Sequence, residues 1–132
     1  MVSVDDKIEL YSHAGVFCCP SIYEPFGIID LEAMACETAV VASAVGGIKE
    51  VVIEGETGHL AELNQMTESP FEATHPEQFA RDLATRINEV MADPAQRERM
   101  GKAGRKRAEE VFSWSAIEEQ VAALYESLLR QQ

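Results

Sequence analysis

Residues 16–43 read VFCCPSIYEPFGIIDLEAMACETAVVAS and place two short apolar runs on either side of a loop and a helical segment. The runs VFCCP (16–20) and AVVAS (39–43) lack polar–apolar alternation, which is typical of strands buried on both faces. Between them, the proline and glycine of SIYEPFG (21–27) predict a loop, and IIDLEAMAC (28–36) predicts a helix. Strands joined through a helix in this way pair in parallel.

The flanking segments extend this alternation of helices and strands. Residues 4–14 show helical spacing with Ser3 as N-cap, residues 48–53 predict a short helix or turn, and GHLAE (58–62) predicts a third strand. Further along, we expect an exposed loop over 64–74 and helices over 76–93, 95–111 and 113–129.

The fold class that follows is α/β, with a Rossmann-like parallel sheet and terminal helices. Only three strands are evident, whereas such sheets commonly have five or six, so the chain corresponds to the back half of a doubly wound domain. We assign residues 1–111 to a partial Rossmann-like domain and residues 112–132 to the C-terminal helix of the same unit. Phe112 and Trp114 are expected to staple the start of that helix onto the core.

Composition restricts the partners. The 132 residues carry 11 Lys and Arg against 23 Asp and Glu, a net charge of −12, which disfavours nucleic acid. The basic run over 97–107 is interrupted by acids and predicts a solvated helix face. No apolar run reaches the ~20 residues that a membrane span needs, and no signal peptide is evident. Unpaired cysteines suit the cytoplasm, and the scattered histidines predict no metal site.

The loop over 21–27 carries the chemistry, because ligands of open parallel sheets bind beyond the carboxyl ends of the strands. Backbone N–H groups of Gly27, Ile28 and Ile29 open the next helix and form a natural seat for a phosphate. Glu24 and Glu32 flank this seat and can accept hydrogen bonds from hydroxyl groups. A sugar–diphosphate–ribose–base ligand fits this arrangement, although two glutamates at this separation also arise by chance in an acidic chain.

Gly46 and Gly47 form a second loop, after the second strand. They lack the spacing of a dinucleotide fingerprint, so an NAD site has little support. A plain turn and a contact with the ligand are equally compatible with these two residues.

Taken together, EPFGIIDLEAMAC (24–36), AVVASAVGGIKEVV (39–52) and EGETGHL (54–60) resemble the C-terminal nucleotide-sugar domain of retaining GT-B glycosyltransferases of the glycogen-synthase-like group. The ending VFSWSAIEEQVAALYESLL (111–129) resembles the terminal helices of the same family. The resemblance implies a donor site that moves glucose from ADP- or UDP-glucose to a glucan or other sugar acceptor, without a metal or cofactor.

The resemblance also implies roles for individual residues. Glu24 would be the catalytic residue and hold hydroxyls of the donor sugar, and Glu32 would bind the ribose. The remaining donor-binding residues would be Phe26, Gly27, Ile28, Thr38, Gly46 and Gly47.

The sequence departs from the family pattern at several positions. Glu37 and Ala39 stand where a Gly-Thr-Pro turn is usual, Asp30 where Asn is common, and Lys49 where Pro is frequent. The cationic pair that clamps the diphosphate comes from the first half of this domain in the family, and residues 1–14 do not supply it. We therefore expect little transferase activity from this chain alone.

Two alternatives remain. The chain could be a non-catalytic, self-associating half-domain that forms homo-oligomers through an exposed sheet edge. It could also be a flavodoxin-like domain with a different ligand, in which case Glu24→Gln would not affect the binding of a nucleotide sugar.

Overall fold

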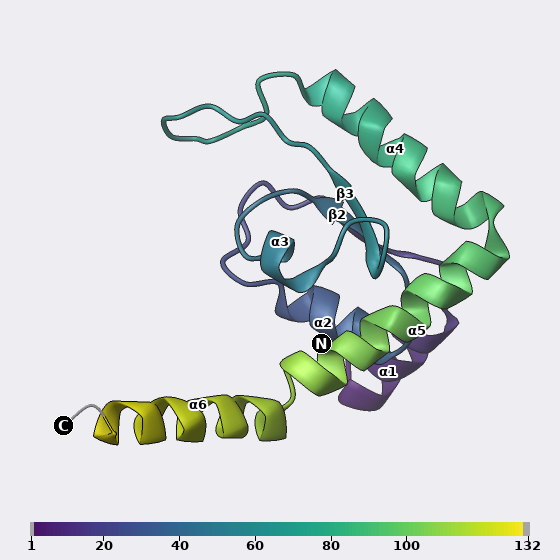
Figure 1. The fold of residues 1–132 in the computed structure, drawn as a ribbon. Coiled ribbons are helices and arrows are strands. Elements are labelled where there is room, and N and C mark those ends of the chain that lie inside the picture. Colours follow the sequence, from purple (N-terminus) through teal and green to yellow (C-terminus); the bar gives the residue numbers. More distant parts are fainter. Residues whose placement is uncertain (1, 131–132) are drawn as a thin grey trace.

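The computed structural model describes residues 2–130 and confirms the predicted order of elements (Figure 1). In chain order they are α1 (Val4–His13), β1 (Phe17–Cys19), α2 (Ile28–Ala35), β2 (Val40–Ser43), α3 (Ile48–Val51), β3 (Gly58–Ala61), α4 (Pro76–Ala92), α5 (Pro94–Val111) and α6 (Trp114–Leu129).

The three strands form one parallel sheet, as predicted, and their order in the sheet is β1–β2–β3. Cys18 pairs with Val41 and Val41 with His59, so β2 is the central strand. Because the strands are parallel, the segments that follow β1 and β2 leave the sheet at the same edge.

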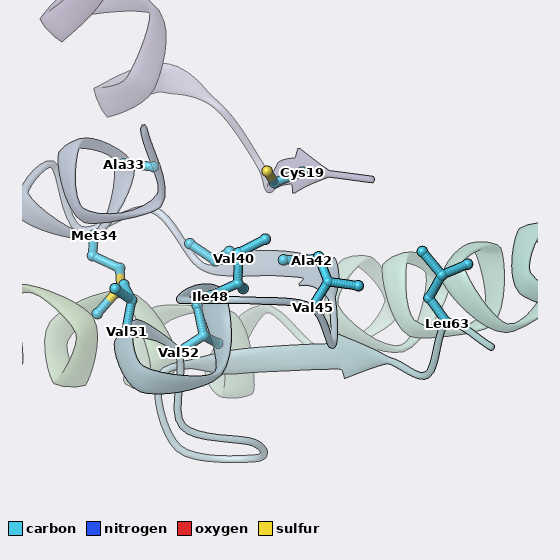
Figure 2. Close-up of a cluster of buried hydrophobic side chains, with 10 residues drawn as sticks. All are labelled: Cys19, Ala33, Met34, Val40, Ala42, Val45, Ile48, Val51, Val52 and Leu63. Carbon is cyan, nitrogen blue, oxygen red and sulfur yellow. The ribbon is translucent and has the colours of Figure 1, made fainter. Parts of the chain in front are cut away.

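The central strand is buried on both faces, which explains its continuous apolar sequence. Val40 and Ala42 face a core cluster built with α2 and α3, in which Met34, Ile48 and Val51 are fully buried (Figure 2). Val41 points the other way, into a second cluster with Val90 of α4 and Met100 of α5. Helices therefore cover both faces of β2.

Side-chain caps fix where several helices begin. Ser3 and Asp6 form a reciprocal capping box at the start of α1, and Asp93 accepts from the backbone N–H groups of Ala95 and Gln96 at the start of α5. Ser113 accepts from Ala116 N at the start of α6. These caps match the predicted helix starts closely.

The C-terminal helix α6 extends away from the body of the molecule (Figure 1). None of its residues is buried, and its element contacts are chiefly with α5. Trp114 is 88% exposed, so the predicted staple is wrong for this residue, whereas Phe112 packs against the main core cluster. Among residues 2–130, no helix is both long and apolar enough to span a bilayer.

The segment over 64–74 forms the projecting loop that the sequence predicted, with one antiparallel bridge between Gln65 and Ala73 at its base (Figure 1). The Gln65 side-chain amide donates to the carbonyl oxygens of both Ile22 and Phe71. This amide ties the base of the projecting loop to the loop that follows β1.

Candidate functional site

Two loops meet at the carboxyl edge of the sheet, as the sequence predicted. One contains Glu24, Phe26 and Gly27 and follows β1, and the other contains Gly46 and Gly47 and follows β2. The Gly47 N–H donates to the Glu24 carbonyl oxygen at 3.0 Å. Five of the predicted donor-site residues are thereby brought together through their backbones.

Close backbone packing explains the two glycines of the second loop. A Cβ atom on Gly46 would lie 2.0 Å from the Glu24 carbonyl oxygen. One on Gly47 would lie 2.4 Å from the Phe26 Cα and 2.5 Å from the Pro25 oxygen. Any side chain at either position would push the two loops apart, so these glycines support the site through packing.

Gly27 is the N-cap of α2 and adopts a left-handed backbone with φ of 100°. The carboxylate of half-buried Glu24 folds back over this helix start, where its Oε1 accepts from the Gly27 N–H at 3.3 Å. Within residues 2–130, the N–H groups of Ile28 and Ile29 have no acceptor. The start of α2 thus retains two free donors at the positive end of the helix dipole.

Asp30 lies in the first turn of α2 and is completely buried. Neither of its carboxyl oxygens has a hydrogen-bond partner among the residues that the structure describes. Burial raises the pKa of this carboxyl to about 6, and the negative charge of Glu24 acts in the same direction. A Cβ atom on Gly27 would lie 2.9 Å from Asp30 Oδ2. The Asp30 carboxyl therefore lies directly beneath the N-cap of α2.

Glu32 lies two residues after Asp30 on α2 and has different surroundings. Its Oε1 is 2.6 Å from Lys7 Nζ, and its Oε2 accepts from the Tyr11 hydroxyl at 3.4 Å. Lys7, Tyr11 and Glu32 line a pocket between α1 and α2. The contacts of the Glu24 and Glu32 side chains therefore share no residue.

Thr38 does not join the other predicted residues. It precedes β2, whereas Glu24 follows β1, so the two lie toward opposite ends of a parallel sheet. Thr38 is buried, and its hydroxyl donates to the Tyr11 carbonyl oxygen at 2.6 Å. This bond ties the end of α1 to the turn before β2. In this position Thr38 packs two elements together and does not face the loops that carry Glu24 and Gly46.

Two residues from distant segments make contacts that local sequence patterns do not indicate. Lys7, the partner of Glu32, lies 25 residues away on another helix, and no spacing rule connects them. Arg107 lies within the basic run that we expected to be solvated, yet its guanidinium donates to the carbonyl oxygens of Glu50 and Val51. The other half of the expectation holds, because Lys102, Arg105 and Lys106 pair with acids along the exposed face of α5.

Among residues 2–130, no three His, Cys, Asp or Glu side chains are grouped closely enough to bind a metal ion. The site consists instead of backbone donors, glycine contacts and carboxylates. Such a set can accept hydrogen bonds from hydroxyls and donate them to an anion.

Comparisons with known proteins identify relatives of the chain. The sequence profile described as "Glycosyl transferases group 1" matches residues 1–69. Alpha-maltose-1-phosphate synthase of Mycobacterium tuberculosis is 50% identical over 117 residues, which are 89% of this chain and 28% of that protein. The chain thus spans little more than a quarter of the length of this curated relative.

Solved structures agree with this relationship. Sucrose-phosphate synthase from Thermosynechococcus elongatus superimposes with a TM-score of 0.69 at 42% identity, over 92% of this chain and 27% of that one. Anabaena Alr3699/HepE in complex with UDP and glucose superimposes with a TM-score of 0.71 at 28% identity, over 92% of this chain and 30% of that one. The chain therefore belongs to the glycosyl transferases group 1 family, and its fold is that of the corresponding part of the GT-B glycosyltransferases.

Proposed function

We propose that this chain is the donor-binding part of a retaining glycosyltransferase that takes glucose from ADP- or UDP-glucose and passes it to a glucan or other sugar acceptor. The observation that carries the proposal is the meeting of the Glu24 loop with Gly46 and Gly47 around the free N–H groups of Ile28 and Ile29. The similarity to a protein crystallised with UDP and glucose supports a nucleotide-sugar ligand.

In this proposal the diphosphate rests on the N-terminus of α2, where the helix dipole favours an anion. The Glu24 carboxylate leaves the Gly27 N–H and accepts hydrogen bonds from hydroxyls of the donor sugar, beside the reacting carbon. Glu32 exchanges Lys7 for the ribose hydroxyls. The backbone donors stabilise the leaving diphosphate as its charge develops, so the proposal requires neither metal nor cofactor.

Calorimetry of the chain against ADP, UDP and their glucose conjugates tests this proposal. We expect Glu24→Gln to weaken binding of the sugar conjugate about tenfold, because an ionised acceptor is lost, while binding of the free nucleotide stays unchanged. Glu32→Gln should weaken binding of both ligands. Exposed Glu56→Gln, with the same loss of charge, is the matched control.

The proposal assigns the donor sugar to Glu24 and the ribose to Glu32, so the two variants should differ in which ligands they bind less tightly. If Glu24→Gln weakens binding of the free nucleotide as much as binding of the sugar conjugate, Glu24 does not contact the sugar. If the wild-type chain binds none of the four ligands, the donor-site assignment fails. We also expect sugar transfer by the chain alone to be very low, and robust turnover would contradict that expectation.

One observation favours self-association as a second candidate. Among residues 2–130, β1 pairs only with β2, so one side of β1 is a free parallel edge. In α1, the helix that precedes β1, Val4 and Leu10 are each about two-thirds exposed. Light scattering as a function of concentration tests this candidate, and a monomer at all concentrations would contradict it.

A further inference from the structure

The junction between α5 and α6 contacts the donor loop through a pair of aromatic rings. The rings of Phe26 and Phe112 meet edge to face, with centroids 5.9 Å apart and an interplanar angle of 73°. Phe112 is the residue at which α5 ends, and Phe26 lies between Glu24 and Gly27. Phe26 is 39% exposed, so Phe112 covers only part of it.

Arg107 holds Phe112 and α3 together. Its guanidinium carbon lies 5.3 Å from the centroid of the Phe112 ring, a cation–π contact. Its Nε donates to the Val51 carbonyl oxygen at 2.9 Å, and its Nη2 donates to that of Glu50 at 2.7 Å. These carbonyls belong to the last turn of α3, where intrahelical partners are missing.

These interactions form a closed ring of contacts that runs from Phe26 through α3, Arg107 and Phe112 back to Phe26. The N-terminus of α3 is set by Gly47, whose Cα packs directly against the Phe26 backbone. At the other end of α3, Arg107 donates a hydrogen bond to the Val51 carbonyl oxygen and stacks over the Phe112 ring. The Phe112 ring in turn contacts the Phe26 side chain. Phe26 is therefore held by its backbone through one end of α3 and by its side chain through the other.

We propose that Phe112 and Arg107 are positioning residues for the donor loop, because they hold Phe26 and α3 in the arrangement that keeps Glu24 at the start of α2. The consequence for ligand binding rests on the proposed function. The positioning itself does not, because it is a property of the chain without a ligand.

Hydrogen exchange of the ligand-free chain, followed by mass spectrometry, tests the positioning. We expect Phe112→Leu to speed exchange about fivefold in peptides covering residues 46–52, where the Gly47 N–H donates to the Glu24 carbonyl oxygen and the α3 amides are hydrogen-bonded. The leucine keeps the apolar bulk but loses the edge-to-face contact with Phe26. Trp114→Leu is the matched control, since Trp114 lies two residues away and is 88% exposed. Equal exchange over residues 46–52 in the two variants would overturn the proposal.

A second variant tests the same contact from the opposite end and does not depend on Phe112→Leu folding. Phe26→Leu should speed hydrogen exchange over residues 107–113. The double variant with Phe112→Leu should exchange little faster than either single variant, because both substitutions remove the same contact. Arg107→Lys keeps the charge but loses the paired donors, so it should act in the same direction. Unchanged exchange over 107–113 in Phe26→Leu would overturn the ring of contacts.

Titration with UDP-glucose and ADP-glucose separates this inference from the proposed function. If the wild-type chain binds neither ligand, the donor-site proposal fails and the exchange data still decide the positioning. If the wild-type chain binds, we expect Phe112→Leu to weaken affinity about fivefold and Trp114→Leu to leave it unchanged. Equal affinities of these two variants would contradict the role of Phe112 at the site.

Discussion

Glu24 and Glu32 carry the same side chain eight residues apart, yet their surroundings are built in different ways. Glu24 lies in a loop that is fixed by backbone contacts with Gly46 and Gly47, above a buried carboxyl at Asp30. Glu32 lies on a helix and is held by the side chains of Lys7 and Tyr11. The first environment is built from close backbone contacts and is acidic, whereas the second is built from side chains and contains a cation. Substitutions around Glu24 should therefore have larger effects than those around Glu32.

The largest effect is expected at Gly47, where the two loops touch. Its backbone φ of −71° suits any residue, so Gly47→Ala tests packing alone, and we expect it to lower the free energy of unfolding by about 3 kcal/mol. Gly55→Ala is the control, because a Cβ there meets open space and only its φ of 76° is unfavourable, which costs about 1 kcal/mol. Urea titration followed by circular dichroism measures both, and equal losses would show that the loop contact is not rigid.

The next effect concerns the buried carboxyl beneath Glu24. Because the folded-state pKa of Asp30 is raised to about 6, the native state keeps a proton that the unfolded chain has already lost. The stability that this group contributes is present below about pH 4 and is lost as the pH rises through 6. At pH 7 to 8 we expect Asp30→Asn to be more stable than the wild type by up to about 3 kcal/mol.

The pH dependence is the decisive part of that comparison. The advantage of Asp30→Asn should shrink as the pH falls from 7 toward 4, because the carboxyl of the unfolded wild-type chain then begins to take up the proton that the folded chain already holds. Thermal unfolding of both chains across pH 4 to 8 measures this difference. An advantage that does not vary with pH would mean that Asp30 is not buried as a charged group at neutral pH.

The smallest effect is expected at Lys7. Its ion pair with Glu32 is short, but the two side chains are 40% and 34% exposed, so Lys7→Met should change the free energy of unfolding by less than about 1 kcal/mol. If Glu32 leaves Lys7 to bind ribose, the same variant should bind nucleotide slightly more tightly, as calorimetry can measure. If Lys7→Met lowers the free energy of unfolding by about 2 kcal/mol or more, or weakens nucleotide binding, then Lys7 supports the fold or the ligand directly. The surroundings of Glu32 would then not differ from those of Glu24 in the way described above.

The sequence was sufficient for those parts of the fold that depend on local patterns. The unbroken apolar run of β2, the caps at Ser3 and Ser113, and the break at Asp93-Pro94 each depend on a few neighbouring residues. The meeting of Glu24 with Gly46 and Gly47 was also predictable, because parallel strands bring the loops that follow them to one edge.

The parts that were missed depend on contacts between distant segments. Nothing near Thr38 indicates that its hydroxyl bonds to the end of α1, and nothing near Arg107 separates it from the solvated cations beside it. Trp114 fits a staple by position, but α6 leaves the body of the molecule before its side chain can pack. Tertiary geometry decides each of these cases.

The exposure of Trp114 has a practical consequence for every unfolding experiment on this chain. It is the one tryptophan in the sequence, and its indole already faces solvent in the native fold. Its emission spectrum should therefore shift little on denaturation. A tryptophan packed against the core, for example by Phe79→Trp on α4, would provide the optical signal that the natural fluorophore lacks.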